Sequence, residues 1–322
     1  MKRVFMAGGL VALAVLAFGT FALRDRDPAA ASANAWRVQP PFAKSEEARL
    51  NISGMACAPA TQSRRRCLAV NDEKKYAQFF STEGTTIVPG DVIALRRDTE
   101  SGDPDAEGAA YDAGYFYVTG SHGRSRKNEL KESVFLVFRI SSDADPQVVQ
   151  TANLRDAIRN APIIGDYAER PLAENGVNIE GIAARNGQLY FGLRAPVIGG
   201  KAFIVRANAD ALFKGKAQIM IHSLELGADT GIRDIAAVDT GFLILAGATL
   251  EQNVASTIFH WDGASQEPKK IADLDLTGLP RNARAEGLLI LDETPENYKI
   301  LVVFDGMLDG APREFTLNKP VS

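Results

Sequence analysis

A short motif recurs five times along the chain, and this repetition constrains the fold more than any other feature. The copies are Asn51-Ile-Ser53-Gly54-Met-Ala, Asp105-Ala-Glu107-Gly108-Ala-Ala, Asn178-Ile-Glu180-Gly181-Ile-Ala, Ile232-Arg-Asp234-Ile235-Ala-Ala and Arg284-Ala-Glu286-Gly287-Leu-Leu. Their key positions, 53, 107, 180, 234 and 286, are 54, 73, 54 and 52 residues apart. A nearly constant period of this length indicates a series of repeated structural units.

Each unit contains the same series of strand-like segments. After the motif comes a segment rich in aromatic and β-branched residues, such as 188–191, then a third segment, such as 202–206, and in most units a fourth, such as 218–223. Four short strands in about 50 residues are typical of a propeller blade. The sequence therefore predicts an all-β, five-bladed β-propeller with four-stranded blades. A sixth blade stays open as an alternative, although no sixth copy of the motif is present.

The irregular parts of the repeat also have an interpretation. The one long interval contains residues 153–160, which predict a short helix, and residues 162–175, which predict a loop. The last unit ends before a fourth strand can form. Propellers avoid an exposed sheet edge by closing the ring, so we expect an N-terminal strand, Trp36–Gln39 or Phe42–Leu50, to complete the last blade.

The first residues have the pattern of an export signal. Lys2 and Arg3 precede an apolar run over residues 4–23, and a positive segment before an apolar core directs export. Cleavage could follow Thr20-Phe21-Ala22 or Ala31-Ser32-Ala33. The run is also nearly long enough to remain as an uncleaved membrane anchor.

These alternatives set the expected domains and location. Residues 1–33 are interpreted as a signal peptide or anchor with a linker, and residues 34–322 as one propeller domain. The protein is expected in the periplasm or outside the cell, or else anchored in the inner membrane and facing the periplasm. Membrane contact would occur only through the uncleaved N-terminal segment.

The charge of the chain limits the classes of partner, and its two cysteines predict a disulfide. The net charge is −4 and no stretch gathers many basic residues, so a nucleic-acid partner is not expected. The run Arg64-Arg65-Arg66 is interpreted as a solvated hairpin tip, and the protein is expected to be a monomer.

Cys57 and Cys67 flank this hairpin, which predicts a cross-strand disulfide in an oxidising compartment, with two buried free thiols as the alternative.

Several motifs together resemble a known bacterial family. Asn178-Ile-Glu180-Gly181-Ile-Ala, Gly192-Leu-Arg194-Ala-Pro196, Thr119-Gly-Ser121-His122 and Gly231-Ile-Arg233-Asp234-Ile occur along the chain, and they resemble a family of exported proteins known as domain of unknown function 3616. The resemblance covers roughly residues 48–316. The chain is more distantly similar to esterase-like phytase propellers, a resemblance that implies calcium-dependent phosphoester hydrolysis.

The repeat predicts where polar residues converge. Antiparallel neighbours place the start of a first strand beside the end of a second strand, so both lie at one mouth of the central channel. The motif starts bring Glu107, Glu180, Asp234 and Glu286 to this mouth. The second-strand ends bring Glu73, His122, Arg194 and Thr249, which occupy one equivalent position when the blades are aligned on Gly120, Gly192 and Gly247.

The residue types at this mouth suggest a division of roles. Calcium accepts six to eight oxygen ligands, so Glu107, Glu180, Asp234 and Glu286 are the predicted calcium ligands. Glu73, Arg194, Arg233 and Thr249 are the predicted contacts of a small anionic ligand, which carries a phosphate group in the hydrolase hypothesis. His122 and Glu180 are the candidate catalytic residues of a phosphoester hydrolase.

Two functional hypotheses follow. In the first, an exported propeller binds a cation and a small anionic ligand at one mouth, and its enzymatic version is a calcium-dependent phosphoester hydrolase. In the second, a non-catalytic binding or interaction propeller of the cell envelope carries the acidic residues only to hold its blades together. Whether the chain is an enzyme is left open by the sequence.

Overall fold

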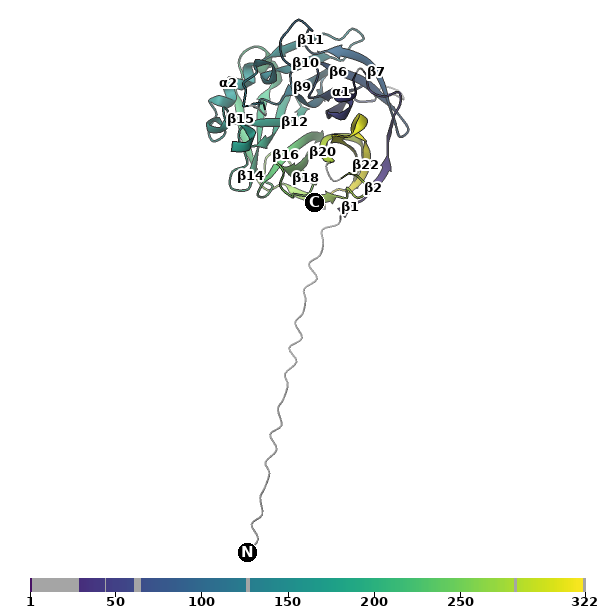
Figure 1. The fold of residues 1–322 in the computed structure, drawn as a ribbon, viewed down its shortest axis with the longest axis vertical. Coiled ribbons are helices and arrows are strands. Elements are labelled where there is room, and N and C mark those ends of the chain that lie inside the picture. Colours follow the sequence, from purple (N-terminus) through teal and green to yellow (C-terminus); the bar gives the residue numbers. More distant parts are fainter. Residues whose placement is uncertain (2–28, 44, 61–64, 126–127, 281–282, 321–322) are drawn as a thin grey trace.

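The computed structural model describes Met1 and residues 29–43, 45–60, 65–125, 128–280 and 283–320. Within these residues, five sheets, each built on four antiparallel strands, stand in a ring around a central axis, as Figure 1 shows. This arrangement confirms the predicted all-β, five-bladed propeller, and the described part of the chain contains no sixth sheet. Residues 2–28, which hold most of the predicted signal or anchor, lie outside the described residues.

Each blade has four strands that follow one another from the axis outward. They are β4 (Ile52–Cys57), β5 (Cys67–Asn71), β6 (Tyr76–Glu83) and β7 (Thr86–Ala94) in blade 1; β8 (Ala106–Asp112), β9 (Tyr115–Gly120), β10 (Val137–Ser141) and β11 (Val148–Thr151) in blade 2; β12 (Asn178–Arg185), β13 (Gln188–Ala195), β14 (Lys201–Asn208) and β15 (Ile219–Glu225) in blade 3; β16 (Thr230–Val238), β17 (Gly241–Ala248), β18 (Thr257–Trp261) and β19 (Lys269–Leu274) in blade 4; and β20 (Arg284–Glu293), β21 (Asn297–Asp305), β22 (Arg313–Asn318) and β2 (Ser32–Ala35) in blade 5.

The hydrophobic cores lie between neighbouring blades. Because side chains alternate along a strand, each sheet offers one apolar face to the blade before it and one to the blade after it. Between blades 3 and 4, for example, Tyr190 packs against Phe242 and Trp261. Trp261 is fully buried in this layer. The alternating pattern therefore fixes the blades relative to one another and makes the ring rigid.

Helical segments interrupt the blades at a few points. The predicted helix in the long interval is present as α2 (Asn153–Arg159), which buries Leu154 and Ile158 in the layer between blades 2 and 3. The remaining helical segments are α1 (Glu46–Leu50), α3 (Ala209–Phe213), and the short 3₁₀ turns η1 (Glu132–Phe135), η2 (Gly165–Tyr167), η3 (Leu172–Glu174) and η4 (Leu308–Gly310). None of the helices in the described part of the chain is long and apolar enough to cross a membrane.

Residues 29–38 form a strap that runs along the outer edges of three blades. First β1 (Ala29–Ala30) pairs with β19 of blade 4, then β2 completes blade 5 beside β22, and finally β3 (Arg37–Val38) pairs with β7 of blade 1. Each pairing satisfies backbone groups that an open edge strand would leave exposed.

The strap confirms closure by an N-terminal strand but corrects its position. Trp36–Gln39 reaches blade 1 rather than completing blade 5, and Phe42–Leu50 contains helix α1. The closing strand Ser32–Ala35 was not predicted, because it contains no β-branched or aromatic residue that would indicate a strand. Cleavage after Ala33 would cut through the strap, whereas cleavage after Ala22 would leave it intact.

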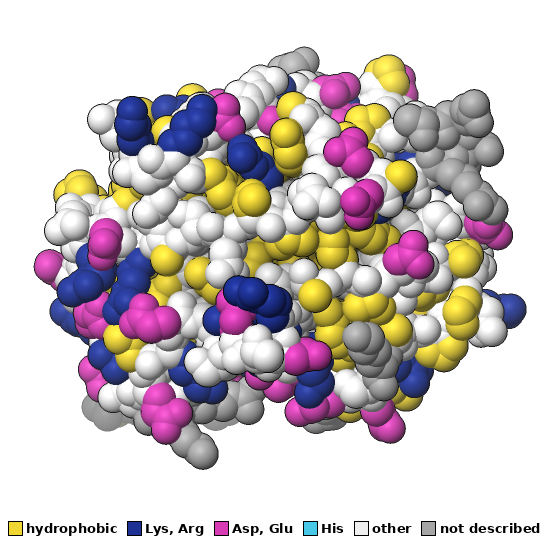
Figure 2. Space-filling model, turned by 90° about the horizontal axis from the view of Figure 1, so that it is seen from above, with side chains coloured by type: hydrophobic (Ala, Val, Ile, Leu, Met, Phe, Trp, Pro, Cys, Tyr) yellow, Lys and Arg dark blue, Asp and Glu magenta, His cyan; other side chains and the backbone are white. Residues whose placement is uncertain are grey.

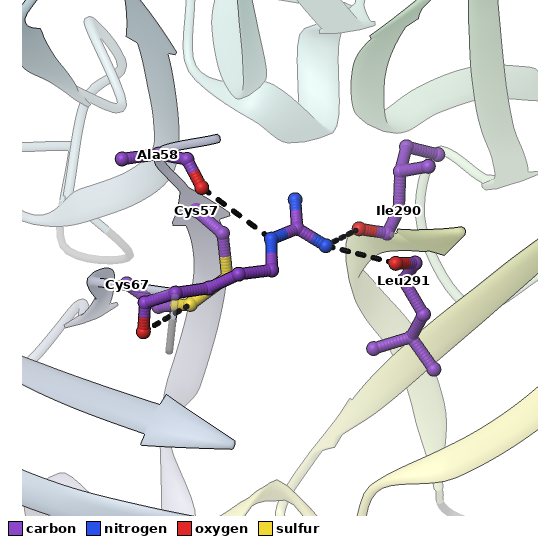
Figure 3. The surroundings of a disulfide bond; sticks show 6 residues. Cys57, Ala58, Cys67, Ile290 and Leu291 are labelled. Atoms are coloured by element: carbon purple, nitrogen blue, oxygen red, sulfur yellow. Dashed lines mark hydrogen bonds between the residues drawn. A yellow bond between two sulfur atoms is a disulfide. The ribbon is translucent and has the colours of Figure 1, made fainter. Parts of the chain in front are cut away.

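The seam between blade 5 and blade 1 has two further clasps. On one face, Arg49 of α1 forms two hydrogen bonds to the carboxylate of Asp309 in η4, at 2.9 and 2.7 Å. On the other face, the guanidinium of Arg65 donates to the carbonyl oxygens of Ile290 and Leu291, both at 2.9 Å; Figure 3 labels the two acceptor residues and marks these hydrogen bonds with dashed lines. Arg65 is therefore a cross-blade contact and not the solvated tip that the arginine run predicted; Arg64 lies outside the described residues.

A disulfide joins Cys57 and Cys67, as predicted, and the two residues pair directly across strands β4 and β5. The bond closes the loop that carries Arg65, whose Nε also donates to the carbonyl oxygen of Ala58. The disulfide thus holds the base of the loop whose arginine reaches blade 5 (Figure 3).

Removing this disulfide should weaken both the hairpin and the seam. For Cys57→Ser combined with Cys67→Ser we expect the free energy of unfolding to fall by about 2–3 kcal/mol, because a loop of this length loses that much entropic constraint in the unfolded chain. Urea denaturation of the oxidised protein and the double variant measures the difference. An unchanged unfolding midpoint would contradict this role of the disulfide.

The outer surface of the ring carries both hydrophobic and charged side chains. Figure 2 views the molecule from the side, where a band of hydrophobic side chains is flanked by charged side chains of both signs. Exposed apolar side chains such as Val149 on β11 and Met220 on β15 lie on the outermost strands of blades 2 and 3. The strap pairs with the outer strands of blades 4, 5 and 1 and leaves these two edges uncovered.

Candidate functional site

Every innermost strand has a β-bulge at the same position. In each blade, one residue near the start of the innermost strand has no partner on the second strand. The residues before and after it pair with two consecutive residues of the second strand. A bulge re-aims the side chain of the extra residue and is common beside functional sites. We call these five residues the collar: Ser53, Glu107, Glu180, Arg233 and Glu286.

The collar corrects the alignment of the fourth motif. In blade 4 the residue left out of the pairing is Arg233, since Ile232 pairs with Ala246 and Asp234 with Leu245. Asp234 instead occupies the position that glycine holds in the other four blades. The collar is therefore not a ring of acids, because one of its five members is a cation.

The glycine after the bulge has a packing role. A Cβ atom added to Gly181 would lie 2.6 Å from the Cα atom of Asp234, and one added to Gly108 would lie 2.9 Å from the backbone nitrogen of Ile182. At Gly108 and Gly181 the inner strands of adjacent blades thus approach so closely that a Cβ atom would collide with the neighbouring backbone.

Asp234, which stands in the glycine position of blade 4, ties this blade to the next. Its carboxylate accepts hydrogen bonds from the backbone N–H of Leu288 in blade 5, at 2.7 Å, and of Ile235, at 2.8 Å. The side chain is 1% exposed, and burial raises its pKa well above the usual range. These contacts give Asp234 a structural role between blades 4 and 5.

A second ring of residues follows the mouth ends of the second strands. In each blade, one second-strand residue pairs with the residue just before the bulge, and the residue that follows it along the chain lies at the mouth. We call these five following residues the rim: Asp72, Ser121, Arg194, Gly247 and Asp305. The predicted equivalence of Glu73, His122, Arg194 and Thr249 is therefore wrong. The glycines used to align the blades do not occupy one position: Gly120 and Gly247 pair with residues before the bulge, whereas Gly192 pairs with the residue after it. Arg194 belongs to the rim, while the other three lie further along the chain.

Arginines neutralise one half of the mouth. The buried guanidinium of Arg233, 4% exposed, forms ion pairs with Glu286 and, at 3.4 Å, with Glu180. Arg194 donates from Nη1 to Glu180 at 2.9 Å and from Nε to the carbonyl oxygen of Thr249 at 2.7 Å. These contacts show that side chains of blades 3, 4 and 5 converge on the axis, as predicted.

The other half of the mouth is acidic. Asp72 of the rim, Glu107 of the collar and Asp105 beside it influence one another electrostatically, and none of them has an ion pair among the described residues. Burial, then the charges of Asp105, Glu286, Glu73 and Asp305, raise the pKa of Asp72 to about 9. Burial and the neighbouring carboxylates also raise the pKa of Glu107, whose side chain is 9% exposed.

This acidic half also contains oxygen atoms that lack a donor. Asn71 Oδ1 and Asp72 Oδ1, at the mouth end of β5, are buried without a hydrogen-bond partner among the described residues, and so is Asn178 Oδ1 at the start of β12. A buried acceptor without a partner costs about 1–3 kcal/mol. The arrangement is therefore short of positive charge and of donors, which a bound cation would supply.

His122 lies apart from these groups. Its ring, 2% exposed, packs edge-on against Phe135 and borders a small cavity of about 10 Å³ that Arg155 and Val177 also line. Burial, then the charge of Arg155, lowers the pKa of His122 to about 3, and neither ring nitrogen has a partner among the described residues. The ring is thus neutral and enclosed by the segment that contains α2.

The remaining predicted site residues lie at the edges of the mouth. Glu73 is exposed and contributes to the charges around Asp72, whereas Thr249 reaches Arg194 through its backbone oxygen. Sequence reasoning assigned no role to Asp72 or Asp105. Asp72 directly follows a second strand, and Asp105 directly precedes a motif strand. Once the strand register is known, these positions identify both residues.

The predicted calcium shell does not match these groups. Among the residues that the structure describes, no three Asp, Glu, His or Cys side chains gather as the ligands of one ion. Arg233, with its two glutamates, occupies the centre of the predicted four-carboxylate set. The full set of Glu107, Glu180, Asp234 and Glu286 therefore does not fit as a calcium shell, and a cation would have to rely on the acidic half and its amide oxygens.

Comparison with known proteins identifies a family but no activity. A family described as "Protein of unknown function (DUF3616)" matches residues 62–135 and 143–313, more than half of the chain. No match was found among curated proteins.

Among solved structures, an exo-β-1,3-galactanase from Phanerochaete chrysosporium, in complex with β-1,3-galactotriose, has a TM-score of 0.52 at 10% identity, over 89% of this chain and 63% of that one. A GH43 β-1,3-galactosidase has a TM-score of 0.49 at 9% identity, over 91% and 60%. The chain thus spans less than two thirds of these proteins, and the first likeness shows the fold alone.

Proposed function

The chain belongs to the DUF3616 family of proteins of unknown function, and we propose that it is an exported propeller that binds a cation and a small anionic ligand at the collar. The observation that carries this proposal is the acidic half of the mouth. Glu107 is buried and Asp72 is half-buried with its Oδ1 atom enclosed, and neither carboxyl group has a cationic partner among the described residues. A cation in this position would allow both carboxyl groups to ionise.

The oxygen atoms available there suit a hard cation. Calcium is bound by carboxylate, amide and water oxygens in loose geometry. The unpaired amide oxygen of Asn71 and the carboxyl groups of Asp72 and Glu107 are of this type. When bound, the cation would hold these residues together and offer positive charge to a ligand. Of the four predicted calcium ligands, only Glu107 belongs to this proposed site.

Arg194 is the proposed contact of the anionic ligand. Its Nη1 and Nε are engaged by Glu180 and Thr249, whereas no described hydrogen bond uses Nη2. The two contacts fix the plane of the guanidinium, and a fixed guanidinium binds planar or tetrahedral anions well. Its side chain is only 14% exposed, which would limit the anion to a small group such as phosphate.

Binding is better supported than hydrolysis. A phosphoester hydrolase needs a proton-transferring group at the substrate, and the predicted base His122 packs beneath the α2 segment instead. The disulfide between Cys57 and Cys67 supports export, since such bonds persist in oxidising compartments. We therefore propose that the protein is a binding protein of the periplasm or of the space outside the cell.

The proposal is tested by thermal unfolding at pH 7.5 with Ca²⁺, Mg²⁺ or a chelator, each with and without inorganic phosphate. Ca²⁺ at about 100 times its Kd should stabilise the native state by about 2.7 kcal/mol. Phosphate should add to this effect only when the cation is present. Glu107→Gln, which removes one carboxylate without changing the shape of the side chain, should abolish the Ca²⁺ effect.

Glu174→Gln is the matched control, because Glu174 is exposed on η3; this variant should respond to Ca²⁺ like the unaltered protein. A parallel assay with p-nitrophenyl phosphate separates the hypotheses, since turnover would restore the hydrolase. The proposal fails if neither ion nor phosphate changes the unfolding temperature.

A further inference from the structure

A second cavity lies at the seam between blade 5 and blade 1, on the face of the ring opposite to the collar. Strand β4 runs from Ser53 in the collar to Cys57, and Cys57 borders this cavity. Its volume is about 320 Å³, within the range of about 300–1,000 Å³ for small-molecule sites. We call it the seam pocket; the lining residues that matter here are Asn34, Trp36, Arg65, Asp292, Lys299 and Glu314.

The strap contributes a fixed aromatic side chain to this pocket. Trp36 donates from Nε1 to the carboxylate of Glu314 at 2.8 Å, and its backbone N–H donates to the carbonyl oxygen of Pro312 at 2.9 Å. An indole whose polar edge is already bonded offers its apolar ring to a ligand. The ring therefore forms a rigid, apolar part of the wall.

The charges around the pocket cancel. Arg65 and Lys299 carry positive charge, and Asp292 and Glu314 carry negative charge; Lys299 lies 3.8 Å from Glu314. A ligand with a net charge would gain from one pair and lose to the other. A neutral ligand that can both donate and accept hydrogen bonds would gain from both pairs.

Further neutral polar groups extend this pattern. The hydroxyl groups of Thr82 and Thr85 lie on the β6–β7 hairpin side, and the amide of Asn34 lies on the strap side. Each of these groups can donate and accept. The pocket thus combines one apolar ring with a surrounding set of mixed donors and acceptors.

We propose that the seam pocket binds a neutral, hydroxyl-rich ligand of the carbohydrate class. A sugar ring has an apolar C–H face, which would lie against Trp36, and hydroxyl groups that both donate and accept, which would bond to Asp292 and Lys299. This site is separate from the collar and does not depend on the cation proposed there. It would give the propeller a saccharide-binding face.

The two tryptophans make the test direct. The chain contains only Trp36 and Trp261, and Trp261 is fully buried between blades 3 and 4. Titration of the full chain with glucose, maltose, cellobiose or lactose should therefore change the emission of Trp36 alone. Trp36→Phe should abolish the change. Glucosamine and glucuronic acid are the charged comparisons and should bind at least tenfold more weakly than the best neutral sugar.

Two variants test the polar contacts while leaving the hydrogen bonds of Arg49 and Arg65 across the seam in place. Asp292→Ala and Thr82→Val remove side-chain groups that make no hydrogen bond to the described residues, so the unfolding temperature should be unchanged while the affinity falls at least tenfold. Glu107→Gln at the collar should leave sugar binding unchanged. The proposal is overturned if about 10 mM of every neutral sugar, ten times a Kd of about 1 mM, leaves Trp36 emission unaltered. It is equally overturned if a charged sugar binds best, or if both pocket variants bind like the unaltered protein.

Discussion

Arg233→Met is expected to lower the free energy of unfolding by about 3–5 kcal/mol, the largest effect expected of any single substitution in the collar. The guanidinium is buried between Glu180 and Glu286 and neutralises both. Methionine fills a similar volume but leaves two carboxylates from neighbouring blades facing each other without a cation. Equilibrium urea denaturation at pH 7 measures the loss.

An exposed arginine provides the control for this prediction. Arg159 pairs with Asp156 and Glu169, but its side chain is 48% exposed, so Arg159→Met should cost less than about 1 kcal/mol. Adding Glu286→Gln to Arg233→Met should recover part of the lost stability, because one of the two unpaired charges is then removed. A loss below about 1 kcal/mol for Arg233→Met would mean that the collar carboxylates do not depend on this arginine.

The protein without a bound cation should lose stability as the pH rises, by an amount of the order of 3 kcal/mol or more. Burial and nearby carboxylates raise the pKa of Asp72 from 3.8 to about 9. The folded state therefore keeps protons that the unfolded state has already released. The stability that these protons provide is complete below pH about 4 and is lost as the pH rises to about 9.

Substitution of Asp72 tests the origin of this pH dependence. Asp72→Asn should raise the unfolding temperature at pH 8, by about 2 °C or more for a domain of this size, and should flatten the decline between pH 6 and 9. Asp262→Asn is the comparison of opposite sign, because backbone N–H groups of Ser265 and Ala264 lower the pKa of Asp262. It should reduce stability at neutral pH and leave the alkaline decline in place. A profile that is flat or rises from pH 6 to 9 would refute the assignment.

The blade count could be predicted from the sequence because the repeat and the fold share one period. Each motif starts an inner strand, so five motifs give five blades. Closure of the ring was predictable in principle from the short last unit. The identity of the closing strand was not, because Ser32–Ala35 pairs through its backbone and its side chains carry no pattern.

The site was predicted less completely, since it depends on strand register. Aligning the fourth motif on its carboxylate selected Asp234, whereas aligning it on the aliphatic-alanine pair, Ile235-Ala236 against Ile182-Ala183, selects Arg233 as the structure does. Burial of His122 was not predictable, because it results from the α2 segment folding back over blade 2.

The most direct measurement of the central claim, that the acidic half of the collar mouth is a cation site, is calorimetric titration with Ca²⁺ at pH 7. Performed in two buffers with different heats of ionisation, it counts protons as well as ions. Because the raised pKa of Asp72 keeps this carboxyl protonated at pH 7 and the pKa of Glu107 is raised as well, binding should release between one and two protons per ion, and Asp72→Asn should lower this number by about one. Absence of binding, or binding without proton release, would contradict the account.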